Sequence, residues 1–229
     1  MQNNYHTVVD VVIASRKSVR GFTEQSVDPQ LIKHILTVAS RSPSGTNIQP
    51  WKVHVLTGKF LVEFGQGAME TYANPELMAK QPKKPFDYYP TEWFSPYIER
   101  RRKVGYDLYA VLGIEKKDKD AMQTQHTKNY NFFGAPVGLI FTMNPKLSIG
   151  SLLDFGMFIQ SIMISAQSHG LATCPQAAWI LIQGYIREKL NLNDDLIICG
   201  MAMGYENQQE LANKLTTERE IVDNFAQFY

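Results

Sequence analysis

The chain has 229 residues, 44% of them hydrophobic and 20% charged, so it is long enough to bury a substantial apolar core. A formal net charge of +1 provides no general field that would hold nucleic acid or an anionic membrane. Five scattered histidines lack the spacing of metal ligands, so no metal site is expected. No apolar run would span a bilayer, and Met1–Asp10 has no signal-peptide pattern, which predicts a soluble cytoplasmic protein.

The cysteines are too few for a disulfide scaffold. The chain has two, Cys174 and Cys199, and each lies in an apolar segment. Small secreted domains that depend on disulfides have a much higher cysteine density. We therefore expect two buried thiols that contribute to packing.

The first predicted element is a helix that ends in a basic stretch. Thr7 and Asp10 have the spacing of a capping box, and apolar pairs four residues apart extend the helical pattern to Arg16. Gly21 favours a stop, so the residues before it are expected to be extended. The stretch reads Arg16, Lys17, Ser18, Val19 and Arg20. Because arginine presents a planar fork of donors, it suits an oxyanion; the alternative is a solvated helix end, where cations are also favourable.

A second helix, a turn-rich loop and a strand follow. Asp28 and Pro29 suit the N-cap and first helical positions, and an apolar stripe continues to Ser40. Val53 and Val55 alternate with polar residues, which predicts a strand over 52–56. The loop offers small and amide side chains to a flat heterocycle, unless it is a plain helix-to-strand connection. It contains Pro43, Ser44, Gly45, Thr46, Asn47, Ile48, Gln49, Pro50 and Trp51.

Residues 72–97 differ in character from the rest of the chain. Five prolines exclude a continuous helix or a central strand, and the seven aromatic residues between them are too apolar for a free linker. We expect an irregular excursion that is either a lid on a substrate pocket or a strap over a partner subunit. Charged, helix-prone surface follows, so the lid region is taken as about 72–120.

The next part of the chain predicts a buried strand and a long helix. Val137–Met143 is almost continuously apolar, as expected of a strand buried on both faces. Ser151 and Asp154 form a second capping box that opens a helix to about His169, and we assign Asp154 this capping role alone. Gly170 ends the helix in the left-handed conformation.

The C-terminal third predicts a helix over 185–190, a second buried strand over 196–203, and a tail with enough apolar residues to pack on a neighbour. Roughly five to seven helices and four or five strands are expected in total. The sequence therefore indicates a single α+β domain over residues 1–229, with a mostly antiparallel central sheet flanked by helices and a C-terminal extension, 205–229, that packs on a partner.

Three motifs in order resemble the FMN-dependent nitroreductase family. They are the Arg-x-Ser-x-Arg stretch from Arg16, the Pro-Ser-Gly-x-Asn-x-Gln-Pro-Trp loop from Pro43, and Cys-Pro-Gln-Ala-Ala-Trp from Cys174, with Arg219 after them. Each motif alone is weak, but their order is fairly specific, and the resemblance extends over nearly the whole chain. It implies a nitroreductase-like sandwich that forms an intertwined homodimer, with FMN at the subunit interface.

Residue by residue, the resemblance implies a cofactor site. Arg16 would hold the FMN phosphate, and Arg20 would lie near the pyrimidine edge, where a cation stabilises the reduced ring. The loop would come from the other subunit, the stretch after Cys174 would lie along the ring near N5, and Arg219 would bind phosphate. The predicted set is Arg16, Lys17, Ser18, Arg20, Pro43, Ser44, Gly45, Asn47, Gln49, Pro175, Gln176, Ala177 and Arg219.

The chain departs from the family pattern at two places. Many members have Glu-Gly where this chain has Gln176 and Ala177, so we expect the contact there to be made mainly by the backbone. A basic residue is often found where this chain has Thr217, which leaves the phosphate one positive charge fewer and predicts weaker FMN retention.

The implied reaction is two-electron transfer by a ping-pong route. NADH or NADPH passes hydride to flavin N5, and a nitroaromatic, quinone or similar acceptor then takes the same place. Because the cofactor carries the chemistry, no catalytic side chain is expected. Three alternatives are a flavin-fold relative with reductive dehalogenase or flavin-cleaving activity, an FMN-binding protein without turnover, and a dimeric scaffold with an empty cleft.

Overall fold

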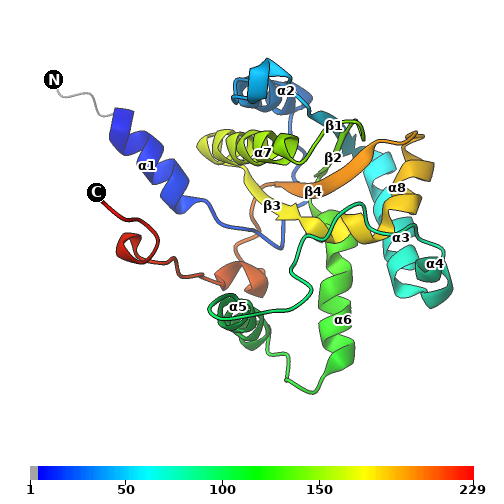
Figure 1. The fold of residues 1–229 in the computed structure, drawn as a ribbon. Coiled ribbons are helices and arrows are strands. Elements are labelled where there is room, and N and C mark those ends of the chain that lie inside the picture. The colour runs from blue at the N-terminus through cyan, green and yellow to red at the C-terminus, as the bar shows by residue number, and fades with distance from the viewer. Residues whose placement is uncertain (1–4) are drawn as a thin grey trace.

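A four-stranded antiparallel sheet lies at the centre of the fold in a computed structural model that describes residues 5–229, with side chains from Thr7 onward (Figure 1). The strands are β1 (Lys52–Thr57), β2 (Val137–Met143), β3 (Ala172–Gln176) and β4 (Leu196–Gly204). Their order is β1-β2-β4-β3, and every neighbouring pair is antiparallel. The prediction of an α+β fold with a mostly antiparallel sheet is confirmed. The first four residues of the predicted domain, and of Met1–Asp10, lie outside the described residues.

Helices cover both faces of this sheet. Their bounds are α1 (Tyr5–Ser15), α2 (Pro29–Ala39), α3 (Gly58–Ala73), α4 (Pro75–Ala79), α5 (Tyr97–Val111), α6 (Lys119–Thr127), α7 (Gly150–Ser168) and α8 (Gln183–Lys189). α2 and α7 pack on one face, and α3 packs with α8 on the other (Figure 1).

Strand β2 shows why both faces are covered. Leu139 and Phe141 point into the core beneath α2 and α7, whereas Ile140 points into the core beneath α3. Successive side chains of a strand point to opposite faces, so a continuous apolar run needs an apolar layer on each side. All seven residues of β2 are buried, as the sequence predicted.

The local signals for α2 and for the end of α7 are confirmed, but the capping box assigned to α1 is wrong. The N–H of Gln30 donates to Oδ1 of Asp28 over 2.8 Å, and Gly170 has a φ of +75°. α1 already begins at Tyr5, so Thr7 lies inside its first turn and cannot be the N-cap. A capping box specifies only a local set of hydrogen bonds, and here Tyr5 and His6 already belong to the helix before the predicted cap.

Eight α-helices occur within residues 5–229, one more than the upper end of the prediction. α3 was missed, although Leu61, Phe64 and Ala68 recur at helical spacing and are buried in the core. The predicted excursion begins inside the end of α3, and α4 follows with Asn74 as its N-cap. The irregular part is confined to residues 80–96.

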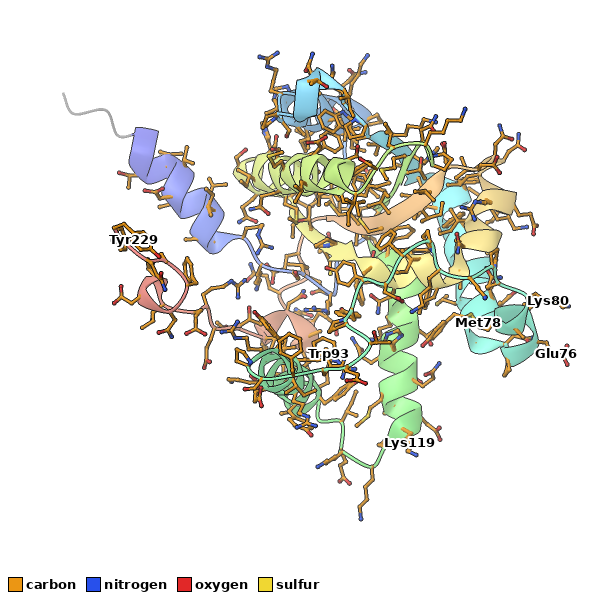
Figure 2. All side chains as sticks on the ribbon, in the orientation of Figure 1. Glu76, Met78, Lys80, Trp93, Lys119 and Tyr229 are labelled. Atoms are coloured by element: carbon orange, nitrogen blue, oxygen red, sulfur yellow. The ribbon has the colours of Figure 1, made fainter. Side chains whose placement is uncertain are left out.

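Two terminal segments project away from the sheet. Figure 1 shows α1 leaving the body of the fold, and Figure 2 shows Tyr229 at the distant end of the C-terminal tail. Across the described part of the chain, none of the helices is both long and apolar enough to traverse a bilayer.

Candidate functional site

The basic stretch after α1 runs beside strand β3. Ser18 forms a parallel bridge with Thr173, and the N–H of Val19 donates to the carbonyl of Thr173 over 3.1 Å. The side chain of Val19 is buried, which anchors the stretch against the core. In extended backbone the side chains alternate, so Arg16, Ser18 and Arg20 share one side. The fold thereby brings the first predicted binding stretch next to Pro175–Ala177.

Among the residues that the structure describes, Arg16 and Arg20 have no counter-ion. Both are half-buried, and the guanidinium of Arg20 donates only to the carbonyl of Ser18, over 3.3 Å. Within residues 5–229, Arg16 makes no side-chain hydrogen bond, and neither arginine has an ion pair. Partly buried cations are normally paired, because desolvating an unpaired charge is costly. This donor set fits an external anion such as phosphate.

The positive charges of Arg16 and Arg20 also affect the pKa of the Cys174 thiol. Burial raises the pKa of its thiol to about 11, while the charges of Arg20 and Arg16 lower it. Burial also raises the pKa of Cys199 to about 12. Both cysteines are free and buried, as the sequence predicted, and both thiols stay protonated at neutral pH.

Lys17 lies on the other side of this stretch. Its ammonium forms an ion pair with Glu206 over 2.7 Å and donates to the carbonyl of Asn213 over 2.8 Å. The charge is therefore used within the chain, to hold the stretch against the C-terminal segment. A role of Lys17 in cofactor binding stays a prediction, and its position here favours a structural role.

Asn213 is a buried connector that sequence reasoning missed. Its Oδ1 accepts from the N–H of Arg20 over 2.7 Å, and its Nδ2 donates to the carbonyls of Gly21 and Asn207 over 2.8 and 2.9 Å. One amide thus fixes the backbone that carries Arg20. No local pattern reveals this, because Arg20 and Gly21 are more than 190 residues away from Asn213 in the sequence.

Arg219 lies in a groove of about 630 Å³ between α5 and the tail. Its guanidinium donates to Oγ1 of Thr217 over 2.8 Å, so Thr217 supports the arginine in place of a second base. On either side of it, Glu218 pairs with Lys103 and Glu220 pairs with Arg100. Neither Arg16 nor Arg20 lines this groove, so the structure of the single chain does not bring Arg219 into one pocket with them.

Gln176 turns its side chain into the protein. Its Nε2 donates to the carbonyl of Asn129 over 2.7 Å, and its Oε1 accepts from the indole N–H of Trp179 over 3.3 Å. Trp179 is fully buried. The amide is thus used in packing, and a contact between the backbone at this position and the cofactor stays a prediction.

The loop after α2 has an unusual backbone conformation. Thr46, Asn47 and Gln49 have φ values of 48°, 60° and 49°, in the left-handed region that non-glycine residues rarely adopt. Such conformations persist only where surrounding contacts impose them, and they concentrate at functional sites. The contact that holds this loop comes from α7.

Asp154 of α7 contacts the loop directly, and its assignment to helix capping is wrong. The N–H of Gly45 donates to Oδ1 of Asp154 over 3.2 Å. α7 begins at Gly150, and the residue at its N-cap position, Ile149, makes no side-chain cap. Asp154 therefore lies in the second turn, where a tertiary contact takes the place of the local one.

The loop and Ser15, the residue that precedes the basic stretch, contact opposite ends of α7. Gly45 bonds Asp154, whereas Ser15 at the end of α1 accepts a hydrogen bond from Gln167 over 3.2 Å. Thirteen residues of helix separate these two contacts, roughly 20 Å at 1.5 Å per residue. Within one chain, the contact that holds the loop and the contact just before the basic stretch are therefore far apart along α7.

An apolar cavity of about 480 Å³ lies between α7, strands β3 and β4, and residues 86–88 in the middle of the excursion. Its walls include Phe86, Tyr88, Leu152, Phe155, Ile159, Pro175 and Ala177. Cavities of this size with few polar groups are typical small-molecule sites. Another cavity, of about 540 Å³ between α2 and β1, contains none of the predicted residues. Among the described side chains, no three of His, Cys, Asp or Glu cluster as metal ligands would.

Comparison with known proteins gives a consistent result. The family model "Nitroreductase family" matches residues 13–205. A 4-nitrobenzoate reductase from Pseudomonas putida is 37% identical over 220 residues, covering 96% of this chain and 94% of the relative. A chloronitrobenzene nitroreductase from Comamonas testosteroni is 35% identical over 222 residues, with 96% of each chain covered.

Solved structures agree with the sequence relatives. The FMN and NADPH-dependent nitroreductase NfnB from Sphigopyxis sp. strain HMH superposes with a TM-score of 0.88 at 34% identity, covering 96% of this chain and 98% of that one. NfnB from Mycobacterium smegmatis has the same fold, with a TM-score of 0.89 at 24% identity and coverage of 98% and 99%. The sheet, the motif order and these matches all agree: the chain belongs to the nitroreductase family.

Proposed function

We propose that this chain is an FMN-dependent oxidoreductase that uses NADH or NADPH to reduce nitroaromatics, quinones or similar acceptors. The observation that carries the proposal is the pair of half-buried guanidiniums, Arg16 and Arg20, which have no counter-ion within residues 5–229. Their stretch runs along β3, and the end of that strand lines the apolar cavity. A flat, phosphate-bearing cofactor has both the anion and the apolar ring that this site requires. The reductase activities printed for the relatives support the same reaction.

The residues that would hold FMN come from three parts of one chain and one part of its partner. Arg16 and Arg219 would bind the phosphate, and Arg20 would lie by the ring as a cation. Ser18 lies between the two arginines of the stretch, and Pro175, Gln176 and Ala177 would line the ring. From the partner would come Pro43, Ser44, Gly45, Asn47 and Gln49.

The protein's part in the reaction is binding, orientation and charge. When bound, FMN supplies the two-electron chemistry, with hydride entering and leaving at N5. Arg20 offers a fixed positive charge where negative charge develops on reduction, and such charge is most effective where water is excluded. The apolar wall of α7 and the excursion would exclude that water. No side chain is assigned as a general acid or base.

We also propose a homodimer that completes this site. Large apolar side chains are exposed on α1, on α7 and on the tail, where a partner would bury them. They are Val8, Val9, Val11, Ile13, Ile149, Leu153, Met157, Ile221, Val222, Phe225 and Phe228. The separation along α7 between the loop and the basic stretch supports the same assembly, because a second copy would have to supply the loop. Residues 205–229 would then be the extension that packs on the partner.

A cytoplasmic location fits this function. NADH and NADPH are supplied inside the cell, and the two free cysteines suit a reducing compartment. We therefore propose that the protein works in the cytoplasm.

The central test is an anaerobic spectral titration of the purified protein. We expect a flavin spectrum that bleaches with NADPH or NADH and returns when nitrobenzene or a quinone is added. Bleaching without reoxidation by either acceptor would point to dehalogenase or flavin-cleaving chemistry instead. A spectrum that stays oxidised with both donors would favour a binding protein. No flavin uptake from added FMN would refute the proposal.

The excursion contains a matched pair of tyrosines that tests the proposed lid. Tyr88 lines the cavity, whereas Tyr89 contacts Tyr88 and Trp93 outside it. We expect Tyr88→Ala to change the relative kcat/KM values of small and large nitroaromatics severalfold, because one wall of the cavity is removed. Tyr89→Ala should change them less. FMN affinity should be nearly unchanged in both; loss of FMN with an unchanged acceptor profile would contradict the lid.

A further inference from the structure

We propose that Asp154 is the positioning residue for the loop Pro43–Gln49, and that it acts on the flavin site of the partner subunit. This inference rests on the proposed function, because the loop matters for catalysis only if FMN is bound. In this role Asp154 holds the loop backbone that would contact the cofactor, and its own side chain makes no such contact.

The geometry singles out this carboxylate. Asp154 is only 7% exposed, and the N–H of Gly45 donates to it over 3.2 Å. Among the described residues this is the one hydrogen bond that its side chain accepts from outside α7. A buried carboxylate is costly unless it is hydrogen-bonded, so its position in the apolar wall of the core calls for a specific role.

The bond acts where the backbone turns into the left-handed region. Gly45 directly precedes Thr46 and Asn47, both of which have positive φ. Ser42, at the other end of the turn, donates its hydroxyl to Oγ of Ser161 on α7 over 2.8 Å. α7 thus holds this part of the chain by two residues, Ser161 and Asp154. Of these, only Asp154 is both charged and buried.

The same helix carries the surface that would meet the partner. Ile149, Leu153 and Met157 are spaced four residues apart and are exposed, so they form a stripe along one side of α7. Asp154 follows Leu153 directly. A dimer formed through this stripe would present the loop to the second subunit, while the chain's own Arg16 stretch lies at the far end of α7.

The first experiment measures FMN binding to apoprotein by the change in flavin fluorescence. We expect Asp154→Ala to raise the Kd by about tenfold, the effect of losing roughly one ordering hydrogen bond. Asp154→Asn keeps an oxygen acceptor and should restore most of the affinity. Ser165→Ala, which removes a buried hydroxyl from the same helix without touching the loop, is the control and should bind FMN as the wild type does.

These variants separate positioning from general stability. If Asp154→Ala binds FMN as tightly as the wild type, or if Asp154→Asn is as weak as Asp154→Ala, the proposal is overturned. Should Asp154→Ala fail to fold, Asp154→Glu keeps the charge but shifts the acceptor by one methylene, and it should also weaken FMN. If the wild type itself binds no FMN, the proposed function is refuted. That result is distinct from a failure of the role proposed for Asp154, in which the wild type binds FMN and the variants do not differ as expected.

Mixed dimers test the action across the interface. One protomer carries Asp154→Ala and the other carries Arg16→Gln, each with its own affinity tag. If the loop acts on the partner, both defects fall in one site, and the second site keeps wild-type FMN affinity. If the loop acts within its own chain, each site has one defect and no wild-type site remains, which would overturn the action in trans.

Discussion

Arg16→Gln is expected to raise the Kd for FMN about 30-fold or more while leaving the folded apoprotein as stable as the wild type. Hydrogen bonds to charged groups contribute about 2 kcal/mol each, which corresponds to about 30-fold in Kd. The free energy of unfolding of the apoprotein should change little, because within residues 5–229 the Arg16 side chain makes no hydrogen bond or ion pair. The measurement is an FMN titration of apoprotein together with thermal melts of the apo and FMN-loaded forms.

The salt dependence of this binding provides a second readout. Wild-type affinity should fall as salt increases, because a charge pair between guanidinium and phosphate is screened, and the variant should show a smaller slope. Arg41→Gln removes the same charge from an exposed position outside the site and serves as the control. Unchanged FMN affinity in Arg16→Gln would mean that this guanidinium is not the phosphate ligand.

Leu153→Asp is expected to abolish the dimer and, with it, most FMN binding. Leu153 is 74% exposed in the single chain and lies between Ile149 at 83% and Met157 at 40%. Burying a leucine stabilises an interface by about 1.5–3 kcal/mol, whereas a buried unpaired carboxylate costs several kcal/mol. A two-fold axis would apply the change to both subunits. The folded monomer should be nearly unaffected, since the side chain is exposed there.

Light scattering over a range of protein concentrations measures the oligomeric state. FMN content and circular dichroism on the same samples report cofactor binding and folding. Val62→Asp places the same charge at an exposed apolar position on α3, on the other face of the sheet, and should remain dimeric. A dimeric, flavin-loaded Leu153→Asp would show that α7 does not form the interface. A monomer that still retains FMN would show that one chain suffices for the site.

Local chemistry in the sequence determined the elements that depend on neighbours along the chain. Asp28 and Pro29 placed the beginning of α2, the apolar run placed β2, and Gly170 placed the end of α7. Each signal works within a few residues, through a cap, a strand period or a permitted backbone angle. The order of the three motifs likewise identified the family from the sequence alone, as the comparisons confirm.

The same local rules gave three errors, of which one has a tertiary cause. The box at Ser151 and Asp154 is a valid capping pattern, yet Asp154 bonds Gly45, 109 residues away. Thr7 lies inside a helix that begins earlier. α3 was missed although its apolar spacing was present in the sequence, so that error came from the interpretation and not from tertiary structure.

Only the tertiary structure decided how the predicted site residues are used. Over residues 5–229 it left Arg16 and Arg20 without counter-ions, paired Lys17 with Glu206, and turned Gln176 inward to Asn129. It also placed the loop and the basic stretch at opposite ends of α7. The sequence determined which groups are present and which short segments carry them. Which groups remain free for a ligand depends on contacts between distant segments, and no local pattern encodes those contacts.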